Sequence, residues 1–344
     1  MTTRRLGLTA TFIALALVWG SSFLLIKESL LGFTPGQVAV GRIVFGAITL
    51  RTIMVVADRA WPREPRFWGH MAVVGLLFCV VPFSLFAWAG ESLPSGLSAI
   101  LNSSTPLMTA LWTAAIVPAE RLAPRQAIGV AVGGLGVVLV VGPWGHAGAL
   151  PPGQAAFGYD FFSPASPILA ELACLGATAC YGLGFAYMRR FVVARYDYDS
   201  LTVSTVQLTL AAAVALALSP ILAAGPLPAP TLVPVALAAL AVLGVFGTGV
   251  AYLWNTAIVR AWGAVAASTV TYVAPLVGVA LGTLVLGETL TWNQPLGCLV
   301  VIAGIIAIHR GSRTAARPSV APAPVGTASR AAGTAPERPL RVRV

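Results

Sequence analysis

The feature that most constrains this chain is a series of apolar runs, each about as long as a helix that crosses a bilayer. A membrane-spanning helix needs about 20 mostly apolar residues. We place ten such runs at residues 8–28, 36–56, 68–89, 95–117, 125–142, 167–188, 201–223, 232–254, 264–286 and 294–309. Only 9% of all residues are charged, against about 25% in soluble proteins. The sequence therefore predicts an all-α integral membrane protein with ten transmembrane helices.

The distribution of basic residues predicts how these helices are oriented. With the N-terminus in the cytoplasm, 19 of the 21 lysine and arginine residues fall on the cytoplasmic side, and only Lys27 and Arg42 lie towards the outer side. Because cytoplasmic loops carry an excess of basic residues, we expect both termini in the cytoplasm. The single lysine beside twenty arginines indicates the codon usage of a GC-rich genome. We expect a multi-pass protein of the bacterial cytoplasmic (inner) membrane.

One short stretch occurs twice, once in each half of the chain. IVPAERLAPRQAIG covers residues 116–129 and LVLGETLTWNQPLG covers residues 284–297, with the valine, the Glu-x-Leu, the glutamine and the closing glycine at the same places. Further pairs follow in the same order, namely Phe86-Ala87-Trp88 with Tyr252-Leu253-Trp254 and Pro106-Leu107 with Pro275-Leu276. We interpret these matches as two copies of one five-helix unit. Because five is odd, the second copy enters the membrane in the opposite direction.

This interpretation divides the chain into four parts. Residues 1–142 form the first five-helix repeat, residues 143–166 an outer loop, and residues 167–310 the second repeat. Residues 311–344 are rich in Ala, Pro and Arg and have almost no large apolar side chains. Such a composition cannot build a packed core, so we expect a disordered basic cytoplasmic tail near anionic lipid.

A set of motifs extends along both halves. It comprises WGSSFLLIKESL in the first span, Arg42 in the second, NSSTPL and TVTYVAPL in the fourth and ninth, and the ERL and ETL bridges. As a set, these motifs resemble the EamA-type transporters of the drug/metabolite transporter (DMT) superfamily, over about residues 11–142 and 168–309. Membership would imply a ten-helix bundle of two inverted halves, a central substrate cavity and alternating access. It would not imply a particular solute, because the members of this family transport very different compounds.

The residues themselves favour a carrier over other classes of membrane protein. Inverted repeats place a site near the midplane between the two halves, and the chain has no GxxxxGK[ST] motif for ATP. We therefore expect a secondary transporter of small metabolites, with efflux of amino acids or related compounds as the leading case, and no cofactor. A membrane enzyme is the first alternative, although no HExxH, GxSG-type nucleophile or intramembrane aspartate pair is present. A channel or scaffold is the second.

Candidate solute contacts in the fourth and ninth spans lie beside prolines. Each proline frees a backbone carbonyl one turn earlier, and in lipid that carbonyl must find a partner or line a wet cavity. Hydrogen bonding between helices is the competing explanation for polar residues at these places. The candidates are Asn102 and Thr105 with the helix-break proline Pro106, and Thr271 and Tyr272 with the helix-break proline Pro275.

Further candidates come from other spans. Trp19, Phe23 and Lys27 follow one another at intervals of four residues and share one helical face, with Ser22 close by. A Trp/Phe wall suits a flat apolar solute, and it equally suits ordinary packing. The remaining candidates are Tyr181, Gln207, Trp254 and Asn255.

Arg42 is the charged residue that most needs compensation. It lies about six residues into the second span, roughly 9 Å from the outer edge at 1.5 Å per residue. An unpaired charge deep in a bilayer costs about 2.5–3.5 kcal/mol on insertion scales. We expect either a structural partner, with Glu28, Glu91, Glu171 and Glu288 as the candidate carboxylates, or a substrate carboxylate. Lys27 lies at a helix end, where snorkelling to the interface suffices.

The bridges and the small residues have structural interpretations. We expect Glu120 and Glu288 to accept backbone N–H bonds at the N-terminus of the helix that follows each of them. Gly129-x-x-x-Gly133 and Gly278-x-x-x-Gly282 are close-packing motifs that serve either within the chain or in a homo-oligomer. The four cysteines, Cys79, Cys174, Cys180 and Cys298, lie in apolar stretches without metal-ligand spacing, and we expect no metal. The expected partners are a small-molecule substrate and the lipid bilayer, with no nucleic acid.

Overall fold

The computed structural model describes residues 2–117, 123–141, 167–193, 195–222, 233–262 and 270–315 of the chain. Every regular element in these ranges is a helix. Six helical stretches are long and apolar enough to cross a membrane, namely Gly7–Ser29, Pro35–Val56, Pro65–Ala89, Pro167–Val193, Ser200–Ile221 and Pro234–Ile258. Shorter apolar helices cover Gln126–Val141, Val273–Leu286 and Asn293–Ile308. The prediction of an all-α membrane protein is confirmed.

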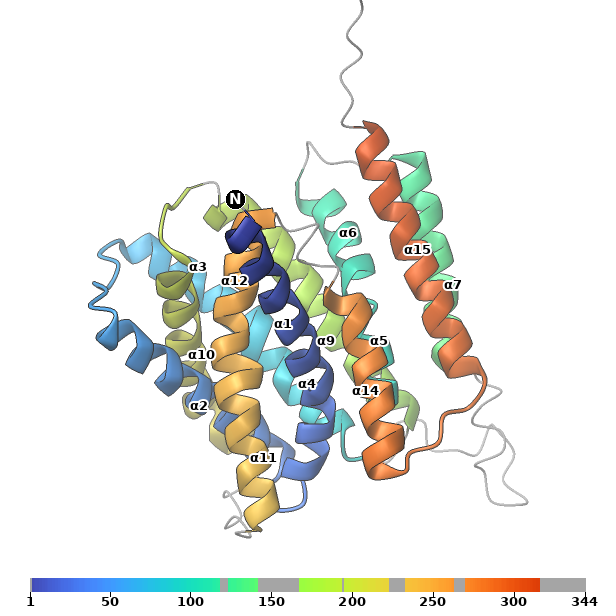
Figure 1. The fold of residues 1–344 in the computed structure, drawn as a ribbon, viewed down its shortest axis with the longest axis horizontal. Coiled ribbons are helices and arrows are strands. Elements are labelled where there is room, and N and C mark those ends of the chain that lie inside the picture. Colours follow the sequence, from blue (N-terminus) through green and yellow to red (C-terminus); the bar gives the residue numbers. More distant parts are fainter. Residues whose placement is uncertain are drawn as a thin grey trace, which may run out of the picture.

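The helices run up and down between the two ends of the bundle in Figure 1, and α1 begins at the upper end. At one edge, α7 packs along α15, and elsewhere α1 packs against α14 and α2 against α10. In chain order the elements are α1 (Thr2–Ser29), α2 (Pro35–Val56), α3 (Pro65–Gly75), η1 (Leu76–Val80), α4 (Val81–Ala89), α5 (Ser95–Asn102), α6 (Thr105–Ile116), α7 (Pro124–Val141), α9 (Pro167–Met188), η2 (Arg189–Val193), α10 (Ser200–Leu222), α11 (Pro234–Gly244), η3 (Val245–Val250), α12 (Ala251–Trp262), α14 (Val270–Leu286) and α15 (Asn293–Ala315).

Two of the membrane-length helices contain a π-helical segment in their interior, and a third, Pro167–Val193, ends in one, η2. Of the two with an interior segment, one consists of α3, η1 and α4, and the other of α11, η3 and α12. In a π-helix each N–H bonds to the carbonyl five residues earlier, and such segments are frequent at functional sites. Pro82 lies in the first turn of α4, two residues after η1 ends, and η3 contains Gly247 and Gly249. These residues weaken regular α-helical bonding at the two places where the helices change their winding.

The helix over residues 95–116 is interrupted between α5 and α6. Pro106 lies in the first turn of α6 and has no N–H to donate to the carbonyl of Asn102. The hydroxyl of Thr105 donates to that carbonyl instead, at 2.8 Å. Ser103 and Ser104 donate to the carbonyls of Ile100 and Leu101 at 2.6 and 2.8 Å. Side-chain hydroxyls therefore satisfy the backbone groups that the break exposes.

Some expected boundaries need correction. α14 continues across Pro275, so the expected break at this proline is not found. Its missing N–H affects one carbonyl near the beginning of the helix. α12 extends to Trp262 rather than 254. α15 extends to Ala315, so residues 311–315 are helical and not part of a disordered tail. The outer loop 143–166 and residues 316–344 lie outside the described residues.

The glycine motifs pack within the chain. A Cβ added at Gly129 would lie 2.7 Å from the carbonyl oxygen of Gly304, so α7 and α15 touch through their backbones here. Gly133 faces Leu107, at 3.3 Å from its Cδ1. A Cβ added at Gly278 would lie 2.5 Å from the Cβ of Ala99. The absence of side chains at these positions permits close helix crossings.

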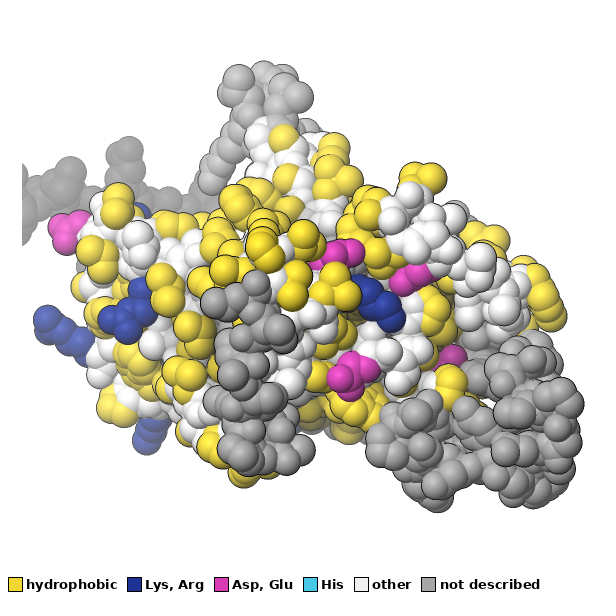
Figure 2. All heavy atoms as spheres, turned by 90° about the horizontal axis from the view of Figure 1, so that it is seen from below, with side chains coloured by type: hydrophobic (Ala, Val, Ile, Leu, Met, Phe, Trp, Pro, Cys, Tyr) yellow, Lys and Arg dark blue, Asp and Glu magenta, His cyan; other side chains and the backbone are white. Residues whose placement is uncertain are grey.

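Two charged side chains join helix ends at the lower end of the bundle. Nζ of Lys27 donates hydrogen bonds to the carbonyls of Gly90 and Leu93, at 2.9 and 2.8 Å. The carboxylate of Glu288 accepts from the N–H groups of Ser95 and Gly96, at 2.8 and 3.1 Å. Glu288 thus caps α5, whereas we expected it to cap the helix that follows it in sequence. Figure 2 shows this end, where acidic side chains gather around a basic one amid hydrophobic side chains.

Candidate functional site

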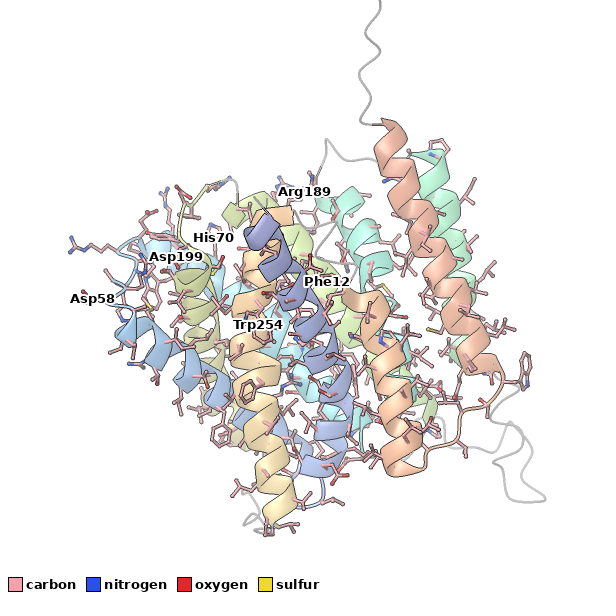
Figure 3. All side chains as sticks on the ribbon, in the orientation of Figure 1. Phe12, Asp58, His70, Arg189, Asp199 and Trp254 are labelled. Carbon is pink, nitrogen blue, oxygen red and sulfur yellow. The ribbon has the colours of Figure 1, made fainter. Side chains whose placement is uncertain are left out.

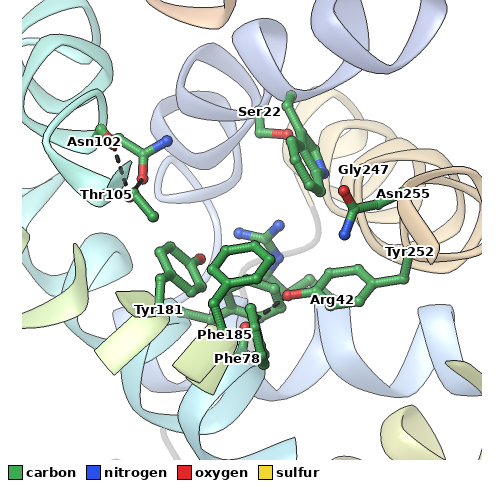
Figure 4. A pocket seen from close by; sticks show the side chains of 12 residues that line it. Ser22, Arg42, Phe78, Asn102, Thr105, Tyr181, Phe185, Gly247, Tyr252 and Asn255 are labelled. Carbon is green, nitrogen blue, oxygen red and sulfur yellow. Dashed lines mark hydrogen bonds between the residues drawn. The ribbon is translucent and has the colours of Figure 1, made fainter. Parts of the chain in front are cut away.

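A cavity of about 80 Å³ lies in the middle of the bundle (Figure 4). Its lining residues are Trp19, Ser22, Arg42, Phe78, Phe83, Asn102, Thr105, Tyr181, Phe185, Gly247, Tyr252 and Asn255. The first seven come from the first 142 residues and the other five from residues beyond 167, so both halves of the chain contribute. Small-molecule pockets usually measure about 300–1,000 Å³. In this conformation the cavity accepts only a small group or part of a larger solute.

Arg42 supplies the charge of the cavity. The residue is 5% exposed, and its Nε donates a hydrogen bond to Oγ1 of Thr248 at 3.2 Å. Its guanidinium carbon lies 3.6 Å from the centre of the Phe83 ring. A desolvated cation over an aromatic face gains about 2 kcal/mol, which offsets much of the cost of placing the charge in the bilayer. A guanidinium has five N–H donors, and Figure 4 shows this one directed into the cavity.

The partner of Arg42 differs from the expected carboxylates. Among the described residues it forms no ion pair with Glu28, Glu91, Glu171 or Glu288, and a hydroxyl and an aromatic ring hold it instead. The hydroxyl and ring retain the guanidinium without neutralising it. An anionic group of a solute would therefore meet a positive charge that no carboxylate of the described chain cancels.

Close backbone packing brings Arg42 to Thr248. A Cβ added at Gly46 of α2 would lie 2.9 Å from Cγ2 of Thr248. One added at Gly244 of α11 would lie 3.1 Å from the carbonyl oxygen of Arg42. The two glycines let α2 approach η3 closely enough for a hydrogen bond between side chains that are 206 positions apart.

Aromatic rings form most of the cavity wall. Phe78 meets Phe185 edge to face, with ring centres 4.8 Å apart. Tyr252 lies edge-on to both Trp19 and Phe83, with centres 6.4 Å apart in each case. Such arrangements place the positive edge of one ring against the negative face of another. The wall is therefore apolar and well packed around the single cation.

Two amides provide uncharged polar groups on opposite sides of the cavity in Figure 4. Oδ1 of Asn102 lies 3.4 Å from Oγ1 of Thr105, whose hydrogen is directed mainly to the backbone carbonyl of Asn102. Asn255 extends from α12, near Tyr252 in Figure 4. An amide offers both donors and acceptors, so this pair can orient a polar solute that has more than one functional group.

The structure brings most of the sequence candidates together. Seven of them line the cavity, namely Trp19, Ser22, Arg42, Asn102, Thr105, Tyr181 and Asn255. Phe23 does not, since it packs edge-on against Phe86 at 5.4 Å. Gln207 is also outside the lining, because its amide donates to Sγ of Cys79 at 3.6 Å. Trp254, which belongs to α12, packs against the apolar cluster that includes Leu15 of α1 (Figure 3). The side chains of Thr271 and Tyr272 lie outside the described residues.

Five lining residues were not among the candidates: Phe78, Phe83, Phe185, Gly247 and Tyr252. Phe185 and Tyr252 belong to repeated motifs, and that repetition was a usable signal. Tyr181-Gly182-x-x-Phe185 repeats Trp19-Gly20-x-x-Phe23, and Tyr252-Leu253-Trp254 repeats Phe86-Ala87-Trp88. Phe78, Phe83 and Gly247 carry no comparable signal. In a membrane protein, phenylalanines that face lipid, core and cavity look alike in sequence.

The fold and the cavity define an integral membrane protein with a buried, positively charged pocket, as expected for a carrier of small solutes. The EamA-like transporter family matches residues 7–142 and again residues 168–310, so the chain belongs to this family. It is 25% identical over 323 residues to the uncharacterized inner membrane transporter YedA of Escherichia coli K12, with 92% of this chain and 95% of YedA covered. The YedA proteins of two other E. coli strains, O6:H1 and O157:H7, match equally.

Comparison with solved structures supports the fold alone. One crystal structure of a protein superposes with a TM-score of 0.58 at 20% sequence identity. The superposition covers 90% of this chain and 99% of the chain in that crystal structure. The correspondence extends over nearly the whole helical bundle.

Proposed function

We propose that this protein is a secondary transporter that moves a small metabolite across the bacterial cytoplasmic membrane by alternating access. The observation that carries the proposal is the central cavity, to which both family-matched segments contribute and in which Arg42 has a hydroxyl and a ring as its contacts. Carriers place such sites near the midplane, between halves that rock against each other. The name of the YedA relatives, an inner membrane transporter, agrees with this location.

In this proposal the carrier consists of ten transmembrane helices in two inverted halves. The packing supports it, because exchanging the halves maps the most extensive helix pairs onto pairs that are also in contact. The pair α1 with α14 becomes α9 with α6, and both are in contact. The pairs α2 with α10 and α7 with α15 each map onto themselves. The π-segments η1 and η3 also occupy matching places, in the third and eighth spans of the proposed order.

The charge distribution supports an orientation with both termini in the cytoplasm. Figure 3 places Asp58, His70, Arg189 and Asp199 towards the end where α1 begins. The segments at this end also carry Arg59, Arg63, Arg66, Arg190 and Arg195. Lys27 lies at the opposite end of α1. Excess basic charge at one end indicates the cytoplasmic side.

The chemistry of the cavity favours a solute with a carboxylate and an apolar body. The guanidinium of Arg42 suits a carboxylate, the amides of Asn102 and Asn255 suit further polar groups, and the rings suit the apolar part. Amino acids and related compounds meet these requirements, and efflux is the direction we propose. Since the cavity measures only about 80 Å³, helix movement must enlarge it during the cycle.

A two-stage experiment tests this function. A strain that overexpresses the protein is screened for resistance to inhibitory amino acids and their analogues, and each positive compound is then followed in proteoliposomes. If the protein is a carrier, we expect the solute flux to saturate with concentration and to be stimulated by solute on the opposite side of the membrane. Linear, non-saturating flux would indicate a channel, and chemical conversion without net movement would indicate an enzyme.

A further inference from the structure

A second cavity, of about 200 Å³, lies apart from the central one, at the end of the bundle where α1 ends. It shares no residue with the lining of the central cavity. Its wall includes Ser92 before α5, Val140 of α7, Glu171 of α9, and Thr291 and Asn293 at the start of α15. Four segments thus converge on a space lined by both polar and apolar side chains, to which the proposed transport site does not extend.

Asn293 is held in this wall with a defined orientation. Its side chain is 2% exposed, and Nδ2 donates to the carbonyls of Leu139 and Val140, each at 3.1 Å. Since both amide hydrogens are directed to the end of α7, the orientation of the amide is fixed. Within the described part of the chain, Oδ1 of Asn293 has no hydrogen-bond donor. A buried oxygen acceptor in this state is stabilised by a cation or by an added donor.

Glu171 places a carboxyl group in the same wall. It lies five residues into the membrane-length stretch Pro167–Val193 and is 2% exposed. An ionisable group at such a place in a membrane protein points to a function, because ionisable residues within membrane spans are rare and typically face a cavity or the interior of the bundle. A carboxyl group in the wall of a cavity offers oxygen atoms that can take up a proton or coordinate a metal cation.

The charged groups near this end of the bundle have contacts of their own. Lys27 is bonded to the carbonyls of Gly90 and Leu93, and Glu288 to Ser95 and Gly96. Other titratable or charged groups on the surrounding elements include Cys174, Cys180 and Tyr181 on α9, Cys298 on α15, Arg125 at the opposite end of α7 and Glu91 after α4. None of these neighbours lines the second cavity.

We propose that the second cavity binds a small monovalent cation, H⁺ or Na⁺, with the carboxyl group of Glu171 and Oδ1 of Asn293 as ligands. A proton would add to the Glu171 carboxylate, and the resulting O–H could donate to an oxygen acceptor in the wall. A sodium ion would use the same oxygens and the hydroxyls of Ser92 and Thr291, since hard cations prefer oxygen ligands. Cation binding here does not depend on the proposed function, whereas its use as the coupling ion rests on it.

Two binding measurements on the purified full-length protein test this site. The proton arm follows the infrared carbonyl band of protonated carboxylic acids through a pH titration, and the sodium arm measures ²²Na⁺ binding at constant pH. We expect Glu171→Gln to abolish the responding signal. We expect Asn293→Leu to weaken it by about 10–100-fold, as is typical when the shell of a bound ion is damaged. Glu91→Gln, which removes a more exposed carboxyl group outside the cavity, should leave it unchanged.

The outcomes separate the possibilities. A band lost in Glu171→Gln identifies the proton, and ²²Na⁺ binding lost in the same variant identifies sodium. If Glu171→Gln and Asn293→Leu leave both signals as in the wild type, the inference is overturned. Glu171→Asp, which keeps a carboxyl group, should retain binding and serves where the glutamine variant does not fold.

The coupling role is tested in proteoliposomes with the solute that the growth screen identifies. Glu171→Gln should retain solute exchange and lose accumulation driven by a cation gradient. Equal gradient-driven accumulation in this variant and the wild type would overturn the coupling role. Cation binding without any solute movement by the wild type would contradict the proposed function and leave the cation site standing.

Discussion

The hydroxyl of Tyr252 donates a hydrogen bond to the backbone carbonyl of Phe78, at 2.7 Å, across 174 positions of sequence. In an α-helix this carbonyl would accept from residue 82, but Pro82 has no N–H. The π-segment η1 therefore presents a carbonyl beside the cavity that the tyrosine of the other half satisfies. The same tyrosine lines the cavity, so the wall of the site and the irregular segment of the third span are joined.

Removal of this hydroxyl should destabilise the protein. Tyr252→Phe keeps the ring and leaves the carbonyl of Phe78 without its side-chain donor, which costs about 1–3 kcal/mol for a buried group. Thermal unfolding in detergent measures the effect. Tyr196→Phe is the control, because this tyrosine stacks on Tyr198 with ring centres 6.4 Å apart and the change keeps that contact. Equal unfolding midpoints for both variants and the wild type would show that the bond contributes nothing.

The geometry of Arg42, and not only its charge, should matter for transport. Arg42→Lys keeps the positive charge and loses the Nε bond to Thr248 and the planar group over Phe83. We expect the half-saturation concentration for a carboxylate solute to rise by about tenfold, which corresponds to about 1.4 kcal/mol. Arg51→Lys, at an exposed position of the same helix, should transport normally. A comparable loss in both variants would remove the special role of Arg42.

Substitutions of Asn102 and Gln207 should differ in their effect on solute affinity, although both residues were candidates in the sequence analysis. Asn102 lines the central cavity, and Gln207 is 1% exposed and bonded to Cys79 outside the lining. We expect Asn102→Leu to weaken solute affinity by about fivefold or more, the loss of one hydrogen bond of about 1 kcal/mol. Gln207→Leu should lower stability and leave affinity unchanged. Unaltered half-saturation in Asn102→Leu would place Asn102 among the packing residues.

The contact of α7 with α15 should depend on individual glycines. A Cβ added at Gly136 would lie 2.6 Å from the backbone nitrogen of Val301, whereas a Cβ at Gly134 would meet nothing within 4 Å. Gly136→Val should therefore cost about 1–3 kcal/mol through overpacking, and Gly134→Val should cost much less. Chemical unfolding in mixed micelles compares the two. Equal losses would show that α7 does not pack on α15 through this face.

Asp199 should give one end of α10 a pH-dependent stability. Burial raises its pKa, but hydrogen bonds from N and Oγ1 of Thr202, at 2.9 and 3.0 Å, outweigh this and lower the pKa overall. Because the pKa is lowered in the folded state, the ionised Asp199 adds to the free energy of unfolding at pH values above its unfolded pKa of about 3.9. This stabilisation is lost as pH falls through the pKa of the folded state.

Two variants of Asp199 test this sign. Asp199→Ala should cost about 0.5–2 kcal/mol at neutral pH, as for other N-caps, and its deficit relative to the wild type should shrink as pH falls below about 4. Asp199→Asn keeps an acceptor without a titrating group, so its capping contribution should not change with pH. A deficit of Asp199→Ala that stays constant across this range would contradict the assignment.

Much of the membrane architecture could be predicted because a bilayer leaves the backbone few choices. Apolar runs of about 20 residues must be helical there, since every N–H and C=O needs a partner within the helix. The six membrane-length stretches coincide with predicted spans to within a few residues, apart from ends such as Val193 and Ile258. The interruption before Pro106 was also readable, because a proline removes a defined hydrogen bond. Pro275 has the same chemistry and lies in a continuous helix, so the residue type alone does not decide.

The sequence by itself determined that this chain is an all-helical membrane protein of the EamA-like family, and it identified most of the polar residues that meet in the central cavity. Only the tertiary structure decided the partners. Arg42 contacts Thr248 and Phe83 instead of a carboxylate, and Glu288 caps α5 instead of the helix that follows it in sequence. The physical reason is that burial in lipid is a property of each segment. Pairing depends on which of many chemically similar side chains the close glycine crossings bring within a few ångströms.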